Sequence, residues 1–193
     1  MIKIILATSN PHKLDEINAI NTNSEIEFDV VKGDFNPEET GVNFKENALI
    51  KAQEAAKIMK TYCLADDSGL CVDVLEGRPG IHSARYAPTQ SEKIEKLLNE
   101  MKDVPYDWRQ AHFVCSMALV DSDGNLIHSE EGKVYGFIDD APKGENGFGY
   151  DPIFFVSQYD KTIAELPEEV KNNISHRANA LKPMLKWIEE NLI

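Results

Sequence analysis

Apolar residues recur along this chain with two different periods, and the order of these periods predicts its architecture. Residues 3–8 form a continuous apolar and β-branched run, which is typical of a strand buried on both faces. Residues 13–21 then have apolar positions at helical spacing, Leu14, Ile17 and Ile20, and Asn10 and Pro11 suit the N-cap and the first position of that helix. The beginning of the chain therefore predicts a strand, a tight loop and a helix.

The same patterns continue to the C-terminus. Alternating or continuous apolar runs predict further strands at residues 25–31, 62–70, 111–120 and 126–138. Helical periodicity predicts helices at residues 44–59, at 91–102 and after Ser175. Pro183 predicts a kink or a restart in the last of these. Strand and helix alternate at both ends around a meander of longer strands, which predicts an α/β fold with a mixed central sheet flanked by helices, and with two lobes and a cleft.

No repeat, low-complexity tract or linker divides the chain, so residues 1–193 are expected to form a single domain. Apolar residues make up 42% of the chain and charged residues 27%, as in globular proteins. The 20 lysines and arginines stand against 33 acidic residues, which gives a net charge of −13. Such a surface repels a phosphate backbone, so polymeric nucleic acid is not an expected partner.

The three cysteines have neither an even number nor a CxxC spacing, which argues against a disulfide framework and a thiolate zinc site. The first residues lack the apolar length of a secretion signal, and no segment has the apolar length of a membrane span. The expected location is the cytoplasm, without a membrane partner.

Cations occupy two places where helix electrostatics disfavour them. His12 and Lys13 fall in the first turn of the first helix, and His176 and Arg177 lie at the start of the last one. Two such places indicate an anion, because backbone N–H groups and basic side chains hold phosphate together. The alternative is that Lys13 pairs with Glu16 and that the other cations are merely exposed.

Paired carboxylates provide candidate metal ligands. Asp66 and Asp67 follow an apolar run, and as neighbours in a strand they point to opposite faces and have different roles. Glu38 and Glu39 lie in a polar loop, and one glutamate with one aspartate is sufficient for Mg²⁺ when substrate phosphates complete the site. The alternative is a hydrogen-bonded turn at the aspartates and a solvated loop at the glutamates.

The segment "GFGYDP" combines flexible glycines with aromatic residues. Phe148 and Tyr150 can stack on a planar ring, and Asp151 can orient that ring by hydrogen bonding. The same composition is also found in plain turns with aromatic core residues. The five histidines have no metal-binding spacing.

Four segments together, "ATSNPHKLDEI", "ADDSGLCVDVLEGRPGIHSARYA", "GFGYDPIFF" and "ISHRANAL", closely resemble the noncanonical purine NTP pyrophosphatases, the inosine/xanthosine triphosphatase family. The resemblance covers essentially the whole chain. It implies an elongated α/β fold, a homodimer, and a Mg²⁺-dependent hydrolase that converts ITP, dITP and XTP to the monophosphate and pyrophosphate. Such an enzyme removes deaminated purines from the nucleotide pool.

The resemblance also implies residue roles. It makes Asp67 the catalytic proton acceptor and makes Glu38 and Asp67 the metal ligands. Two sets of substrate-binding residues follow. The triphosphate would be bound by Thr8, Ser9, Asn10, Pro11, His12, Lys13 and Lys51, with Ser68 as a further substrate contact. The base would be bound by Phe148, Gly149, Tyr150, Asp151, Lys171, His176 and Arg177.

One pair of residues has a different role from the one inferred above, and one residue differs from the pattern of the family. The resemblance places His176 and Arg177 on the base, where their donors can recognise a purine O6, and this replaces the phosphate role inferred above. Ser9 stands where relatives often carry glycine, and its side chain narrows the approach to phosphate while offering a hydroxyl donor. Two other functions remain open, a pyrophosphatase for other modified nucleotides and a nucleotide sensor without turnover.

Overall fold

The computed structural model describes residues 1–193, and its strands form one seven-stranded sheet. The strand order is β2-β1-β3-β4-β5-β6-β7, and β1 lies parallel to both β2 and β3, whereas β6 is antiparallel to β5 and β7. The sheet is therefore mixed, as the sequence predicts. The strands are β1 (Ile2–Leu6), β2 (Ile26–Val30), β3 (Cys63–Val72), β4 (Gln110–Val120), β5 (Leu126–Ile138), β6 (Phe154–Val156) and β7 (Lys161–Thr162).

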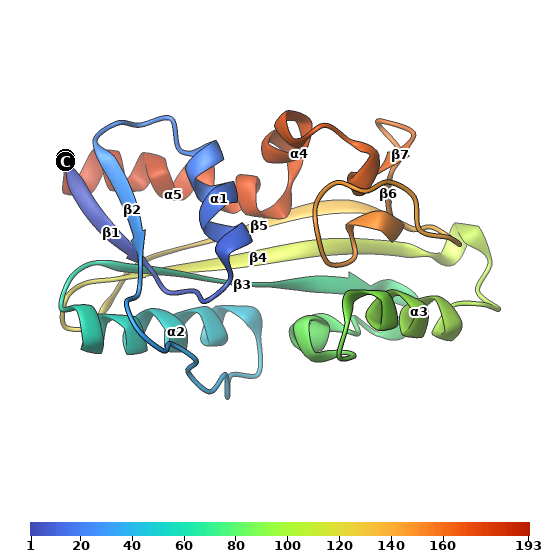
Figure 1. The fold of residues 1–193 in the computed structure, drawn as a ribbon, viewed down its shortest axis with the longest axis horizontal. Helices are drawn as coiled ribbons and strands as arrows, with labels where there is room; N and C mark the ends of the chain where they lie inside the picture. The colour runs from blue at the N-terminus through green and yellow to red at the C-terminus, as the bar shows by residue number, and fades with distance from the viewer. The chain divides into compact units, whose positions relative to one another are not determined.

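Five α-helices and several single turns of 3₁₀ helix accompany the strands (Figure 1). The α-helices are α1 (Pro11–Ile20), α2 (Phe44–Met59), α3 (Gln90–Glu100), α4 (Glu168–Ile174) and α5 (His176–Leu192). The 3₁₀ segments are η1 (Asp73–Leu75), η2 (Gly80–Arg85), η3 (Tyr106–Trp108), η4 (Asp151–Ile153) and η5 (Ile163–Glu165).

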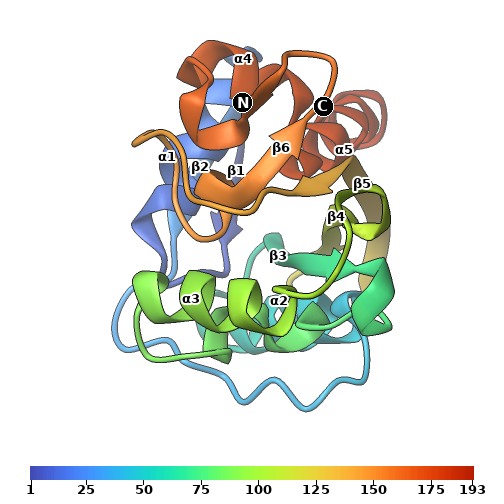
Figure 2. The same ribbon diagram turned by 90° about the vertical axis from the view of Figure 1, so that its right-hand side faces the viewer.

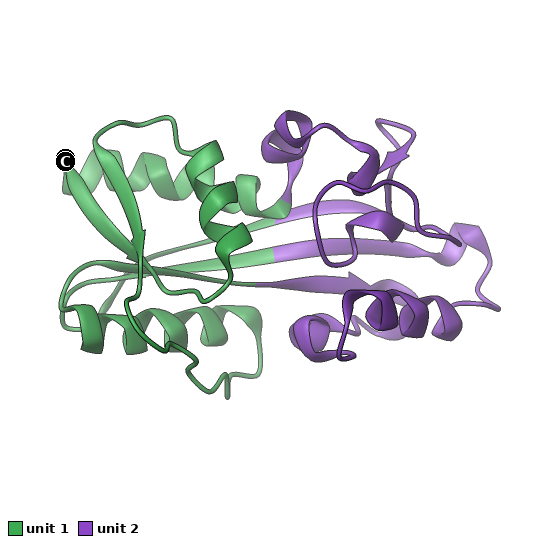
Figure 3. Cartoon of the chain, in the orientation of Figure 1, with its two compact units in different colours: residues 1–67, 115–132, 176–193 green, residues 68–114, 133–175 purple.

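The chain divides into two compact units, coloured in Figure 3. Unit 1 contains residues 1–67, 115–132 and 176–193, and unit 2 contains residues 68–114 and 133–175. In unit 1, α1 and α5 cover one face of the sheet and α2 covers the other (Figure 1).

The first strand shows how unit 1 is built. In β1, Ile4 and Leu6 pack among residues of α1 and α5, whereas Ile5 and Ala7, the residue after the strand, pack among residues of α2. Successive side chains of a strand point to opposite faces, so a strand covered on both sides needs apolar residues throughout. The prediction that this run is buried on both faces is confirmed.

Unit 2 has its own core. Leu97 of α3 and Met101, the residue after this helix, are fully buried and pack with Leu70 of β3 and Phe113 of β4. The Phe113 and Phe154 rings lie 4.5 Å apart in a tilted arrangement. Figure 2 shows α3 on one side of the strands of this unit and α4 on the other.

Helix ends follow the sequence signals closely. The Asn10 side chain accepts a hydrogen bond from the His12 N–H at 3.1 Å, and Pro11 is the first residue of α1. Thr89 and Glu92 form a reciprocal capping box at the start of α3. These residues satisfy backbone N–H groups that have no partner inside the helix.

Three predicted details are corrected. The strand predicted at residues 62–70 continues to Val72, and Asp66 and Asp67 lie inside it, so the alternative of a hydrogen-bonded turn at these aspartates is wrong. Helix α5 runs through Pro183 without a restart. The short helix α4 was not predicted, because its seven residues are too few to show a period.

The α/β fold class with its mixed sheet is confirmed, and the substrate cleft remains a prediction. None of the helices has both the length and the apolar character needed to cross a membrane.

Candidate active site

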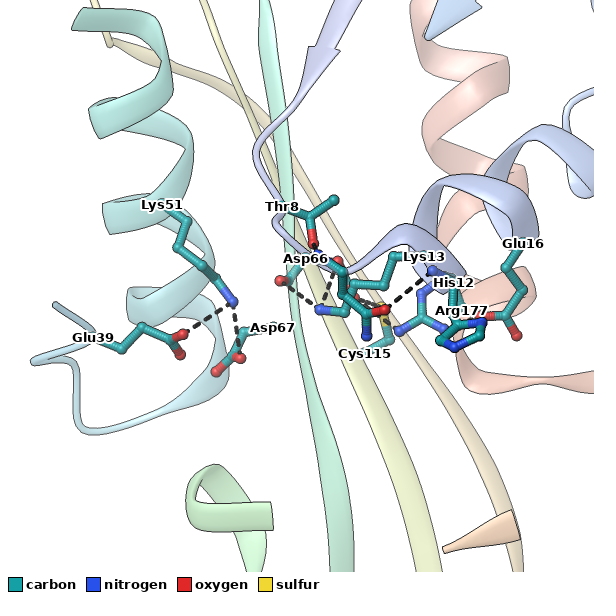
Figure 4. Close-up of polar contacts among 11 residues, drawn as sticks. Thr8, His12, Lys13, Glu16, Glu39, Lys51, Asp66, Asp67, Cys115 and Arg177 are labelled. Carbon is teal, nitrogen blue, oxygen red and sulfur yellow. Dashed lines mark hydrogen bonds and ion pairs between the residues drawn. The ribbon is translucent and has the colours of Figure 1, made fainter. Parts of the chain in front are cut away.

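Strand β3 places two neighbouring carboxylates on opposite faces of the sheet. Leu64 belongs to the core beneath α1 and α5, and Ala65 belongs to the core beneath α2. By alternation, Asp66 points toward α1 and α5, whereas Asp67 points toward α2 (Figure 4). The prediction that the two aspartates have different surroundings is confirmed.

Asp66 lies in a buried network of four charged side chains from α1, β3 and α5. Its Oδ1 is 3.0 Å from Lys13 Nζ, and its Oδ2 accepts a hydrogen bond of 3.1 Å from the Arg177 guanidinium. Arg177 also donates to Glu16 of α1. The network contains two carboxylates and two cations, so its formal charges balance.

This network corrects the alternative pairing considered from the sequence. Lys13 pairs with Asp66 rather than with Glu16, and Arg177 is 1% exposed rather than a surface cation. Helix geometry makes a Lys13–Glu16 pair possible, but the buried guanidinium requires Glu16 as a partner.

The pKa of Asp66 reflects these partners. Burial alone would raise the pKa, but the charges of Lys13, Arg177 and Lys51 outweigh it and hold the pKa well below its usual range. Asp66 is therefore a permanently ionised group, which makes it a poor proton acceptor.

Asp67 has different neighbours on the other face. Its Oδ1 accepts a hydrogen bond of 3.1 Å from Lys51 of α2, and Lys51 is also 3.6 Å from the Glu39 carboxylate. The second oxygen, Asp67 Oδ2, is buried and has no hydrogen-bond partner. Buried oxygens normally have partners, so this atom marks a position for a further group.

Burial raises the pKa of Asp67, and Lys51 offsets only part of this effect because the Glu39 charge also raises the pKa. For Lys51, burial acts to lower the pKa, but Asp67, Asp66 and Glu39 together raise it. The lysine remains charged while the carboxylates around it outnumber it. This side of β3 therefore has an excess of negative charge that an additional cation would stabilise.

The glutamate beside this cluster is Glu39. Glu38, the expected metal ligand, has an exposed side chain, whereas Glu39 is half-buried beside Lys51. No set of three or more histidine, cysteine, aspartate or glutamate side chains is grouped to hold a metal ion. Mg²⁺ commonly uses only one or two protein carboxylates, with phosphate oxygens and water as the other ligands.

The loop before α1 is well ordered by its own side chains. The Thr8 hydroxyl accepts a hydrogen bond from the Asn10 N–H at 3.1 Å, and Asn10 caps the helix. Ser9 is exposed in this loop. In the first turn of α1, Pro11 and His12 are exposed and Lys13 is half-buried.

Unit 2 contains a second polar cluster. Asp151 Oδ2 accepts hydrogen bonds from the Phe148 N–H at 3.0 Å and from Lys171 Nζ at 2.9 Å. The Lys171 ammonium also lies 4.5 Å from the centre of the Phe148 ring. Three residues named from the sequence for base binding thus contact one another.

The remaining named residues have separate places. The Tyr150 hydroxyl donates to the Ser83 carbonyl at 2.8 Å, so Tyr150 is a buried anchor of the loop rather than an exposed stacking ring. Gly149 has a positive φ of 63°. Ser68 is half-buried in β3, and His176 is buried in the first turn of α5.

Sequence reasoning missed two contributors. Glu16 was considered only as a surface partner, although it follows Lys13 by three residues and precedes Ile20 by four, which places it on the buried face of α1. Cys115 lies with its sulfur 3.8 Å from Asp66 Oδ2, in the middle of a strand where no sequence pattern indicates it.

Comparison with known proteins finds a matching family model, similar sequences and similar structures over nearly the whole chain. A model of the Ham1 family matches residues 4–187. The chain is 45% identical to a protein named dITP/XTP pyrophosphatase from Halalkalibacterium halodurans, over 96% of this chain and 98% of that protein. It is 48% identical to one of the same name from Campylobacter jejuni subsp. doylei, over 94% of both chains. The structure of a HAM1 protein from Coxiella burnetii superposes with a TM-score of 0.89 at 40% identity, and covers 98% of this chain and all of that one (100%).

Proposed function

Since the chain belongs to the Ham1 family, we propose that this protein is a hydrolase that converts noncanonical purine nucleoside triphosphates, ITP, dITP and XTP, to the monophosphate and pyrophosphate. The observation that carries the proposal is the buried Asp67 Oδ2 without a hydrogen-bond partner beside Lys51. A carboxylate oxygen in this setting can accept a proton from water.

The proposed reaction needs little covalent chemistry from the protein. A water oxygen attacks the α-phosphorus, the bond from that phosphorus to the bridging oxygen of pyrophosphate breaks, and Asp67 Oδ2 takes the proton of the water. Lys13 and Lys51 offset the negative charge of the phosphates, with Thr8 and Asn10 as further donors. The raised pKa of Asp67 makes it a stronger base than an ordinary aspartate, whereas Asp66 with its lowered pKa is not suited to this role.

We also propose Mg²⁺ as the cofactor. The donor set fits it: the carboxylates of Asp67 and Glu39 both lie beside the Lys51 ammonium and outnumber it, and Glu38 adjoins Glu39 in the loop. Bound Mg²⁺ would supply neutralisation of phosphate charge. The structure favours Glu39 over Glu38, because Glu39 already contacts Lys51.

Base binding is assigned to the cluster in unit 2. The Lys171 ammonium and the Phe148 ring offer a donor and a flat surface, with Asp151 as the anchor of both. A donor such as Lys171 favours a 6-oxo purine, because adenine presents an amino group there and leaves a buried donor unpaired. This accounts for a preference over ATP.

The glycines of this loop provide a matched test of base binding. A Cβ at Gly147 would overlap Asp151 Oδ2, whereas a Cβ at Gly149 meets nothing, and both residues have positive φ. Gly147→Ala and Gly149→Ala therefore share a backbone strain of about 1 kcal/mol, and only the first displaces Asp151. We expect KM for ITP to rise about tenfold more in Gly147→Ala, equivalent to about 1.4 kcal/mol. Equal KM values in the two variants would contradict the assignment.

The activity itself is tested by product analysis. The purified protein is incubated with Mg²⁺ and ITP, XTP, GTP, ATP or dUTP, and the products are separated by ion exchange. We expect ITP and XTP to give monophosphate and pyrophosphate, with GTP and ATP nearly unchanged. A preference for dUTP would instead indicate a pyrophosphatase for other nucleotides, and binding without turnover would indicate a sensor.

We further propose a cytoplasmic homodimer. Three aromatic side chains of unit 2, Tyr106, Trp108 and Tyr135, are 47%, 65% and 69% exposed, and Tyr106 stacks on Phe137 at 5.6 Å. Exposed aromatic side chains are enriched at protein interfaces. Light scattering of the purified protein measures the oligomeric state directly.

A further inference from the structure

Asp66 is held by both of its carboxylate oxygens. Oδ1 is 3.0 Å from Lys13 Nζ, and the Lys13 ammonium lies 3.4 Å from the Asp66 carbonyl oxygen as well. Oδ2 accepts from Arg177 at 3.1 Å. The Asp66 side chain is 1% exposed, so water does not weaken these interactions.

Lys13 differs from the other members of this network. The side chains of Arg177 and Glu16 are 1% and 6% exposed and bond to each other, whereas the Lys13 side chain is 14% exposed at the edge of the network. Of the two cations in the network, Lys13 is therefore the one that reaches the surface. An ammonium that already lies close to a carboxylate gains less electrostatic stabilisation from a second anion.

We propose that Asp66 is the competing counter-ion of Lys13: it positions the ammonium for the phosphate chain and at the same time limits how tightly that chain and the product pyrophosphate are bound. This inference rests on the proposed function, which assigns Lys13 to phosphate. It makes Asp66 a positioning residue, distinct from Asp67 on the opposite face of β3. An enzyme gains turnover when ground-state binding is not excessive, and tight product binding slows release.

The consequence is an unusual pair of effects in Asp66→Asn. Loss of the carboxylate leaves Lys13 without its close anion, so inorganic pyrophosphate becomes the better partner and binds about tenfold more tightly. The turnover number for ITP falls, because Lys13 is no longer held in place and pyrophosphate leaves more slowly. KM for ITP falls together with kcat, whereas a merely misfolded site would raise KM.

The test is titration calorimetry with inorganic pyrophosphate on four proteins: wild type, Asp66→Asn, Lys13→Met and the double variant. We expect the tenfold gain in Asp66→Asn to disappear in the double variant, because the gain acts through Lys13. Pyrophosphate affinity in Asp66→Asn that equals or falls below that of the wild type would overturn the inference and leave the proposed function intact. Unchanged affinity in Lys13→Met would remove the phosphate site itself, and with it the inference.

Asp66→Asn removes one of the two carboxylates that contact Arg177 and could affect folding, so a measurement on the wild-type protein provides a second test. NMR of the lysine ammonium groups, assigned with Lys13→Arg, should show a slowly exchanging Lys13 signal before pyrophosphate is added, and a shift of that signal on titration. Absence of the signal before titration would mean that Asp66 does not hold the ammonium, and would overturn the inference even if Asp66→Asn does not fold.

Discussion

The Asp67→Asn variant is expected to hydrolyse ITP about 1,000-fold more slowly than the wild-type protein, the usual contribution of a positioned general base. Asparagine preserves the size of the side chain and can still contact Lys51, which lies 3.1 Å from Asp67 Oδ1, but it cannot accept a proton from water. The measurement is steady-state release of pyrophosphate from ITP with Mg²⁺. Asp29→Asn is the matched control, because Asp29 is a partly exposed aspartate of β2 in the same unit, paired with Lys3.

The pH profile gives an independent reading of the same residue. The base works only when deprotonated, so kcat should fall on the acid side as Asp67 takes up a proton; burial raises the pKa of Asp67 in the metal-free protein, and bound Mg²⁺ would lower it. The residual activity of Asp67→Asn should lack this acid limb. Activity of Asp67→Asn within tenfold of the wild type, or an acid limb that persists in it, would show that another group takes the proton.

The largest expected effect on stability comes from Arg177→Met. Its guanidinium is 1% exposed and compensates Glu16 and Asp66, so its removal leaves buried carboxylates without their shared partner. Breaking a buried ion network in this way costs about 3–5 kcal/mol. Because domains are stable by about 5–15 kcal/mol, this loss is a large fraction of the total.

Urea unfolding measures this cost, and the chain offers a matched exposed pair. Lys3 Nζ lies 2.8 Å from Asp29 with about half of its side chain exposed, so Lys3→Met should lower the free energy of unfolding far less than Arg177→Met. The double variant Arg177→Met with Glu16→Gln should recover part of the loss, because it also removes the charge of one of the two buried carboxylates that Arg177 contacts. A single-variant loss as small as that of Lys3→Met would mean that water reaches the network.

The sequence predicted the elements around the site well where a strong local signal exists. Asn10 and Pro11 define the start of α1, and the alternation of side chains in β3 separates Asp66 from Asp67. Both signals act over a few residues, so no knowledge of the tertiary structure is needed.

Contacts between segments far apart in the chain were harder to predict from the sequence. Arg177 follows Glu16 by 161 residues, and neither position carries a pattern that distinguishes a buried cation from a surface one. The choice between Glu38 and Glu39 likewise depends on where the loop meets Lys51 of α2. Such pairings depend on packing of α1, α2 and α5 against the sheet, which periodicity alone does not specify.

The alternation in β3 also limits how this protein can change its length. A single inserted or deleted residue before Asp66, with the pairing of the strand otherwise kept, would exchange the faces of the two aspartates and bring each to the wrong partners. A change of two residues would restore their sides. Insertions or deletions in β3 must therefore change its length by an even number of residues, and this requirement is stricter than the one on the identity of its apolar residues. Length variation is better tolerated in the connecting loops.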